Sequence, residues 1–233
     1  MGADFSSHRV FAGNIDANRL RVDVIAAIRR HFDQIGLIEI NDELQASRSV
    51  VIGPAGRWIF VGDSAGSTDV ADWDAFHGLS SDLSRLAPVT DIVMSDDAAV
   101  HFFLYRDCQL VDEFGNAEFP FLAFASEQEA EQVRGNPELW RDLLVERAQT
   151  SDLRKAWTQV WQAQAREILV TTAHLLGWEQ GNDWPSLLWT GYYWDDEGDA
   201  CKYDEFVRNT SVNLAEFEEL HFARNATDAI REP

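Results

Sequence analysis

Three stretches of the chain place apolar residues three and four positions apart, which is the spacing of an amphipathic helix. The first covers residues 20–35, where Asp16 or Asn18 can cap the start of the helix and Gly36 can end it. The second covers residues 69–86 and follows directly on a glycine- and serine-rich turn. These two stretches predict helices in the first half of the chain.

The third stretch is the longest, because residues 151–177 keep one apolar face for about seven turns and end at a glycine. We expect this helix to bury Trp157 and Trp161 against a strand at residues 187–194. Shorter helices are expected at three further places: residues 127–133, 137–148 and 214–220.

Strand patterns concentrate in the first half of the chain. Residues 49–52 and 58–61 flank a Gly-Pro-Ala-Gly sequence, which predicts a β-hairpin with a four-residue loop. Residues 89–94, 100–105 and 109–114 are separated by short polar turns, which predicts an antiparallel meander.

These elements predict an α+β fold, with an antiparallel sheet of a hairpin plus a meander packed with helices and followed by a helical C-terminal portion. No internal repeat or flexible linker interrupts the sequence. We therefore expect a single α+β domain over residues 1–233. Its helix and sheet core would occupy residues 1–116, and its helical portion with a C-terminal strand would occupy residues 117–233.

Acidic residues dominate the charge, with 40 Asp plus Glu against 19 Lys plus Arg and a net charge of -21. This charge repels nucleic acid and anionic membranes, whereas it attracts a basic protein. Acidity also serves solubility alone, so both explanations stay open.

The remaining composition narrows the class of protein. No apolar run approaches the roughly 18 residues of a spanning helix, and no secretory signal is recognisable, so we expect a cytoplasmic protein that does not bind a membrane. Cys108 and Cys201 are too few for a disulfide framework or a cysteine zinc site. No phosphate-binding loop, dinucleotide fingerprint or His-Glu-x-x-His sequence is present, and we expect no cofactor.

Ser64 is the candidate catalytic residue, because it stands in Gly-Asp-Ser-Ala-Gly, the G-x-S-x-G pattern of a serine nucleophile turn. His174 or His221, with Asp195 or Asp199, would have to complete a triad. The sequence context differs from that of a hydrolase, because only one helix and a hairpin precede the motif and the next helix begins late. A turn that hydrogen-bonds locally between a strand and a helix is the other interpretation.

Asp96, Asp97 and His101 are weak candidates for a metal site, because carboxylates and imidazole bind metals. Aspartates at a hairpin tip also serve turn geometry, and strand alternation places His101 on the same face as Phe103 and Tyr105. A half-buried histidine beside aromatic rings is the alternative, so we assign no metal.

An acidic run follows the densest aromatic stretch of the chain. It comprises Asp195, Asp196, Glu197 and Asp199, and its glycine falls in the wrong position for an EF-hand loop. With the neighbouring aromatic residues Tyr193 and Trp194 exposed, this run would suit a protein interface. The alternative is that these aromatic rings fill the core.

Several short motifs resemble those of a loosely defined set of uncharacterised bacterial proteins. They are a Trp-led strand ending in Gly62-Asp63-Ser64, a Ser-Asp-Asp segment within residues 93–101, the hairpin strand 109–114, and Leu175-Leu176-Gly177 followed by Gly191-Tyr192. The resemblance covers roughly residues 50–195 and implies no activity and no site residue. Those proteins favour a histidine where this chain has Ser95, which weakens the metal interpretation.

The leading functional hypothesis is therefore a non-enzymatic, cytoplasmic protein that binds a basic protein through its acidic surface. An immunity-like role, in which it neutralises a toxin, is the most specific form of this hypothesis. A serine hydrolase that uses Ser64 is the alternative.

Overall fold

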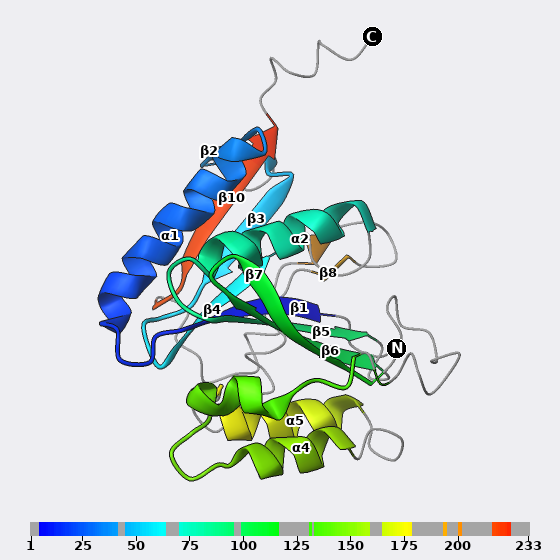
Figure 1. Cartoon of the computed structure of the whole chain (residues 1–233). Coiled ribbons are helices and arrows are strands. Elements are labelled where there is room, and N and C mark those ends of the chain that lie inside the picture. The colour runs from blue at the N-terminus through cyan, green and yellow to red at the C-terminus, as the bar shows by residue number, and fades with distance from the viewer. Residues whose placement is uncertain are drawn as a thin grey trace.

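An eight-stranded antiparallel sheet forms the centre of the protein (Figure 1). The computed structural model describes residues 5–41, 45–63, 70–95, 99–116, 131, 133–158, 165–178, 193–194, 200–201 and 216–224. In spatial order the strands are β2 (Leu37–Ile40), β10 (Glu218–Arg224), β3 (Arg48–Ile52), β4 (Trp58–Asp63), β1 (Phe5–Phe11), β5 (Val89–Ser95), β6 (Ala99–Arg106) and β7 (Gln109–Gly115). With helices packed against this sheet, the predicted α+β class is confirmed.

The predicted hairpin and meander are both confirmed. Strands β3 and β4 pair antiparallel, and Gly53 N–H donates to the Phe60 carbonyl at 2.9 Å where the hairpin opens. Strands β5, β6 and β7 pair in chain order. The Gly/Pro-containing turn and the short polar turns therefore carried enough information to predict these neighbours.

Strand β1 lies in the middle of the sheet, between β4 and β5, and the sequence pattern did not predict it. Its consecutive polar residues from Ser6 to Arg9 are all buried. A central strand is usually recognised by continuous apolar residues, and this one has polar residues at four successive positions.

Strand β10 corrects the expected final helix at residues 214–220. From Glu218 onward the chain is a strand, which lies between β2 and β3 and pairs Leu220 with Val50. The alternation of Leu220 and Phe222 directs both side chains into the core, and pairing on both edges outweighs the local helical tendency of the glutamates. The sheet therefore takes one interior strand from the C-terminal portion of the chain.

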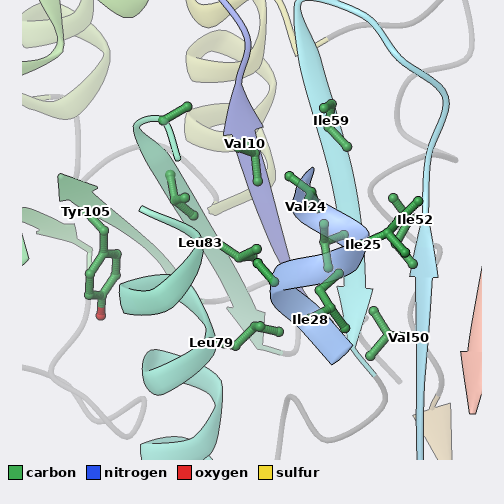
Figure 2. Close-up of a cluster of buried hydrophobic side chains, with 14 of the residues drawn as sticks. Val10, Val24, Ile25, Ile28, Val50, Ile52, Ile59, Leu79, Leu83 and Tyr105 are labelled. Carbon is green, nitrogen blue, oxygen red and sulfur yellow. The ribbon is translucent and has the colours of Figure 1, made fainter. Parts of the chain in front are cut away.

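Helices α1 (Ala17–Gln34) and α2 (Val70–Leu83) cover one face of the sheet, and Figure 2 shows part of the core that they bury. The Asp16 carboxylate caps α1 by accepting from the backbone N–H of Asn18 and Arg19 at 2.9 and 3.2 Å. Gly36 follows the helix with φ of 80°, as its predicted stop requires.

The opposite face carries η2 (Pro137–Leu143), α4 (Thr150–Thr158) and α5 (Ala165–Leu176), which lie on the other side of the sheet in Figure 1. The long helix expected over residues 151–177 is described as α4 and α5, while residues 159–164, including Trp161, lie outside the described residues. Trp157 is buried, stacks on Phe114 at 4.6 Å between ring centroids and meets Trp140 edge-on at 5.4 Å. Among the described residues, Trp157 thus packs on the sheet and on η2.

Within the described part of the chain, no helix is both long and apolar enough to cross a bilayer.

Candidate functional site

The Gly-Asp-Ser-Ala-Gly motif begins at the end of β4, and its Asp63 is the last residue described there. Asp63 is buried and accepts two hydrogen bonds from Arg48, from Nε at 2.8 Å and from Nη2 at 2.5 Å. The Arg48 guanidinium also stacks over the Phe32 ring at 4.8 Å. This carboxylate is therefore a structural partner of Arg48, and Ser64 itself lies outside the described residues.

A serine, a histidine and an aspartate do meet elsewhere, at His8 of β1, Ser80 of α2 and Asp91 of β5. All three side chains are fully buried. Nδ1 of His8 lies 2.8 Å from Ser80 Oγ and 2.9 Å from Asp91 Oδ1, and Ser80 Oγ donates to Asp91 at 2.6–2.7 Å. We call these three residues the His8 cluster.

The His8 cluster has the composition of a catalytic triad but the wrong connectivity. In a triad the serine contacts one ring nitrogen of the histidine and the acid contacts the other. Here Ser80 and Asp91 share Nδ1, and the serine proton points at the carboxylate. Because the cluster is also inaccessible to solvent, its role is to join helix α2 to strands β1 and β5.

Aromatic and imidazole side chains extend this polar region towards β6. The Tyr105 hydroxyl hydrogen-bonds Nδ1 of His77, which lies 3.9 Å from Asp91 Oδ2. Burial raises the pKa of Tyr105 above its usual value, and the charges of Asp91 and Glu113 raise it further. The phenol is therefore a neutral hydrogen-bonding group and not a general base at neutral pH.

The metal hypothesis involved Asp96, Asp97 and His101. His101 is fully buried on the same face as Phe103, its ring stacked on that of Phe103 at 6.0 Å, as strand alternation predicted. Asp96 and Asp97 lie outside the described residues. Among the residues that the structure does describe, no group of three His, Cys, Asp or Glu side chains is arranged to hold a metal ion.

The two aromatic residues beside the predicted acidic surface, Tyr193 and Trp194, lie in a small second sheet. Strand β8 (Tyr193–Trp194) pairs antiparallel with β9 (Ala200–Cys201), with Tyr193 opposite Cys201 and Trp194 opposite Ala200. Asp195, Asp196, Glu197 and Asp199 connect these strands in the chain and lie outside the described residues. The structure thus places the backbone of the two aromatic residues and leaves the hypothesis about the carboxylates untested.

The two histidines considered as partners of Ser64 lie on different elements. His174 is exposed near the end of α5, and His221 lies on β10, where its Nδ1 is 2.9 Å from Ser49 Oγ. Neither is placed relative to Ser64, so the triad stays an untested hypothesis.

A second buried polar group lies on the opposite face of the sheet from the His8 cluster. Arg9 of β1 stacks its guanidinium over Phe60 of β4 at 4.7 Å, and Thr90 of β5 is its cross-strand neighbour. Ser7, two positions before Arg9, points to the same face. Within the described part of the chain, no partner hydrogen-bonds Nε or Nη2 of Arg9 or the hydroxyls of Ser7 and Thr90.

Sequence reasoning missed both buried groups. One usable signal was Asp91 in the middle of the apolar Val-Thr-Asp-Ile-Val-Met strand, because a buried carboxylate requires partners. Arg9 and His8 gave no such signal, since their strand was itself not recognised.

No protein-family model, curated protein sequence or solved structure matches this chain. The function must therefore be inferred from the chemistry of its own residues.

Proposed function

We propose that the protein is a non-enzymatic, cytoplasmic interaction protein that binds a basic protein through the acidic connection between β8 and β9. The binding residues would be Asp195, Asp196, Glu197 and Asp199, with the aromatic rings of Tyr193 and Trp194 at their edge. In its specific form the proposal is immunity-like, with a basic toxin as the partner.

The pairing of surface arginines with acids supports this assignment. In the described part of the chain these pairs are Arg19 with Asp23, Arg21 with Glu218, Arg29 with Glu39 and Glu218, Arg85 with Asp82, Arg106 with Asp142, Arg134 with Glu131, and Arg141 and Arg154 with Glu138. Such pairs neutralise the arginines locally. Carboxylates paired with an arginine add little to the local charge. The unbalanced negative charge of the chain is therefore greatest in segments that contain no arginine.

The segment around the β8–β9 connection has this property. Residues 179–205 contain eight acidic residues and a single basic one, Lys202. A local negative potential of this kind attracts a basic partner over about a Debye length, roughly 8 Å at physiological ionic strength. This concentration of acid in one segment is the observation that carries the proposal.

The pairing of β8 with β9 supplies a second argument. It holds Trp194 and Ala200, which flank the acidic connection in the chain, next to each other. A short connection between paired strands costs less entropy to order on binding than a free tail of the same sequence.

Co-expression tests the proposal in its immunity-like form. The protein is co-expressed with the product of each neighbouring gene, and growth rescue and direct binding are measured for a toxic neighbour. We expect the quadruple variant Asp195→Asn, Asp196→Asn, Glu197→Gln and Asp199→Asn to lose rescue, and wild-type binding to weaken as NaCl rises.

A control variant with the same change in net charge separates a local surface from a general field. Asp33→Asn, Asp107→Asn, Glu146→Gln and Glu167→Gln alter four exposed carboxylates on the described part of the chain. This control should keep rescue and affinity. Equal loss in both variants, or no loss in either, contradicts the proposed surface. Fluorophosphonate labelling that disappears in Ser64→Ala would contradict the non-enzymatic assignment and support the hydrolase.

A further inference from the structure

Arg9 buries its guanidinium group, and no carboxylate of the described part of the chain is paired with it. Its side chain is 1% exposed, and in the described part of the chain nothing accepts a hydrogen bond from Nε or Nη2. Burial lowers the pKa of Arg9 to about 9, which reflects the loss of hydration around the charge. A buried positive charge of this kind is costly unless an anion compensates it. A guanidinium that stays buried and charged therefore points to a bound anion.

The unpartnered edge of Arg9 is the edge that binds carboxylates elsewhere in this molecule. Arg29 donates from Nε and Nη2 to the two oxygens of Glu39 at 2.8 and 3.0 Å. Arg48 uses the same two nitrogens to hold Asp63. Two parallel N–H groups match the two oxygens of a carboxylate, which makes this geometry selective.

Arg57, an exposed arginine just before β4, also stacks on a phenyl ring and has hydrogen-bond partners. Its guanidinium stacks over Phe11 at 4.9 Å, much as Arg9 stacks over Phe60, and it donates to the carbonyls of Leu143 and Leu144 at 3.0 and 2.7 Å. Stacking on a phenyl ring therefore accompanies hydrogen bonding in Arg57.

Two buried hydroxyl residues, Ser7 and Thr90, share the sheet face of Arg9. Thr90 is the cross-strand neighbour of Arg9, so their Cα atoms are about 5 Å apart. Ser7 lies two residues along the strand on the same face, about 7 Å from Arg9. Both hydroxyls are buried and have no partner among the described residues, so a bound anion would supply their missing acceptor.

The indole of Trp178 adds an apolar wall and a further donor. Its ring centroid lies 6.1 Å from that of Trp58 on β4 and 5.8 Å from that of Phe102 on β6. Because β1 and β5 lie between those two strands, the indole of Trp178 covers the strands that carry Arg9 and Thr90. Its Nε1 is also buried without a partner in the described part of the chain.

We propose that Arg9, Ser7 and Thr90 form a binding site for a small monocarboxylate, whose apolar body contacts Phe60 and Trp178. A single guanidinium balances one negative charge, whereas a phosphate dianion would keep an uncompensated charge in a buried place. The aromatic lining favours a carboxylate with an apolar body over acetate or formate. Entry of the ligand requires local opening of the structure around Arg9, because its side chain is almost inaccessible to solvent.

Thermal unfolding of the full chain tests the site, with sodium benzoate and sodium hexanoate as probes. Sodium phosphate and sodium chloride at equal ionic strength serve as comparisons. A ligand that binds only the folded protein raises the unfolding midpoint with the logarithm of its concentration. We expect this rise for benzoate or hexanoate in the wild type and in Arg147→Met, an exposed-arginine control, and no rise in Arg9→Met.

Variants that keep a positive charge separate binding from folding. Arg9→Lys loses the planar pair of donors, and Ser7→Ala with Thr90→Val loses both hydroxyls while retaining the guanidinium. Each should fold and bind the carboxylate at least tenfold more weakly, as measured by calorimetric titration. The proposal is wrong if Arg9→Met responds like the wild type, if only phosphate or chloride shifts the midpoint, or if Arg9→Lys and the Ser7→Ala/Thr90→Val double variant both keep wild-type affinity.

Discussion

The carboxylate of Asp91 is fully buried, and its described hydrogen-bond partners are Ser80 and His8. A carboxylate in this position accepts hydrogen bonds in place of water, so each donor contributes more than it would at the surface. Ser80 donates from α2 and His8 lies on β1, so the cluster connects three elements that are far apart in the sequence. His8 also stacks on Phe76 at 4.1 Å, which holds its ring in place. The triad-like composition of this cluster therefore serves folding.

Ser80→Ala tests this structural role. The change removes a donor to Asp91 and leaves the carboxylate with fewer partners, so we expect the free energy of unfolding to fall by about 1–3 kcal/mol. Ser81→Ala is the matched control, because Ser81 donates to the Cys108 carbonyl in a half-buried position and should cost about 0.5–1.5 kcal/mol. Urea titration measures both values. A loss for Ser80→Ala no larger than that for Ser81→Ala would show that the hydroxyl does not support Asp91.

At the scale of elements, the sequence predicted what local signals specify. Helix α1 has a capping aspartate and a terminating glycine, and the hairpin β3–β4 has a Gly/Pro turn, so both follow from neighbouring residues. Strands β1 and β10 depend on partners more than 30 residues away in the sequence, and their own residues resemble an exposed segment and a helix. The same reason explains the candidate site, since Arg9 and Thr90 become neighbours only through the pairing of β1 with β5.

Phe222→Ala tests whether β10 is an interior strand. Its ring is buried on the α1 face, 4.3 Å from that of Phe32 between centroids. Removing it leaves a cavity between the sheet and α1, which should cost about 3–5 kcal/mol in a denaturant titration. Arg224→Ala is an exposed control on the same strand and should change stability by less than about 0.5 kcal/mol. A cost for Phe222→Ala as small as that of the control would show that the ring is not buried against α1 and would contradict the interior placement of β10.

At the scale of the whole molecule, one sheet separates two hydrophobic cores. One core lies under α1 and α2 and includes Ile28, and the other lies under η2, α4 and α5 and includes Ile168. Successive residues of β1, β4, β5 and β6 point alternately into the two cores, so the same backbone supports both. Loss of either core therefore weakens the strands that the other core needs.

This coupling predicts a single unfolding transition. Ile28→Val and Ile168→Val are the same substitution at buried positions in the two cores, and each should lower stability by about 0.5–1.5 kcal/mol. Because the sheet keeps the two sites apart, the double variant should show the sum of both losses to within about 0.5 kcal/mol. For each of the four proteins, far-UV circular dichroism and tryptophan fluorescence should give the same urea midpoint as each other, because two-state unfolding requires that different probes coincide. Two separated transitions, of which each variant shifts only one, would instead mean that the layers unfold independently and that the chain is not a single cooperative domain.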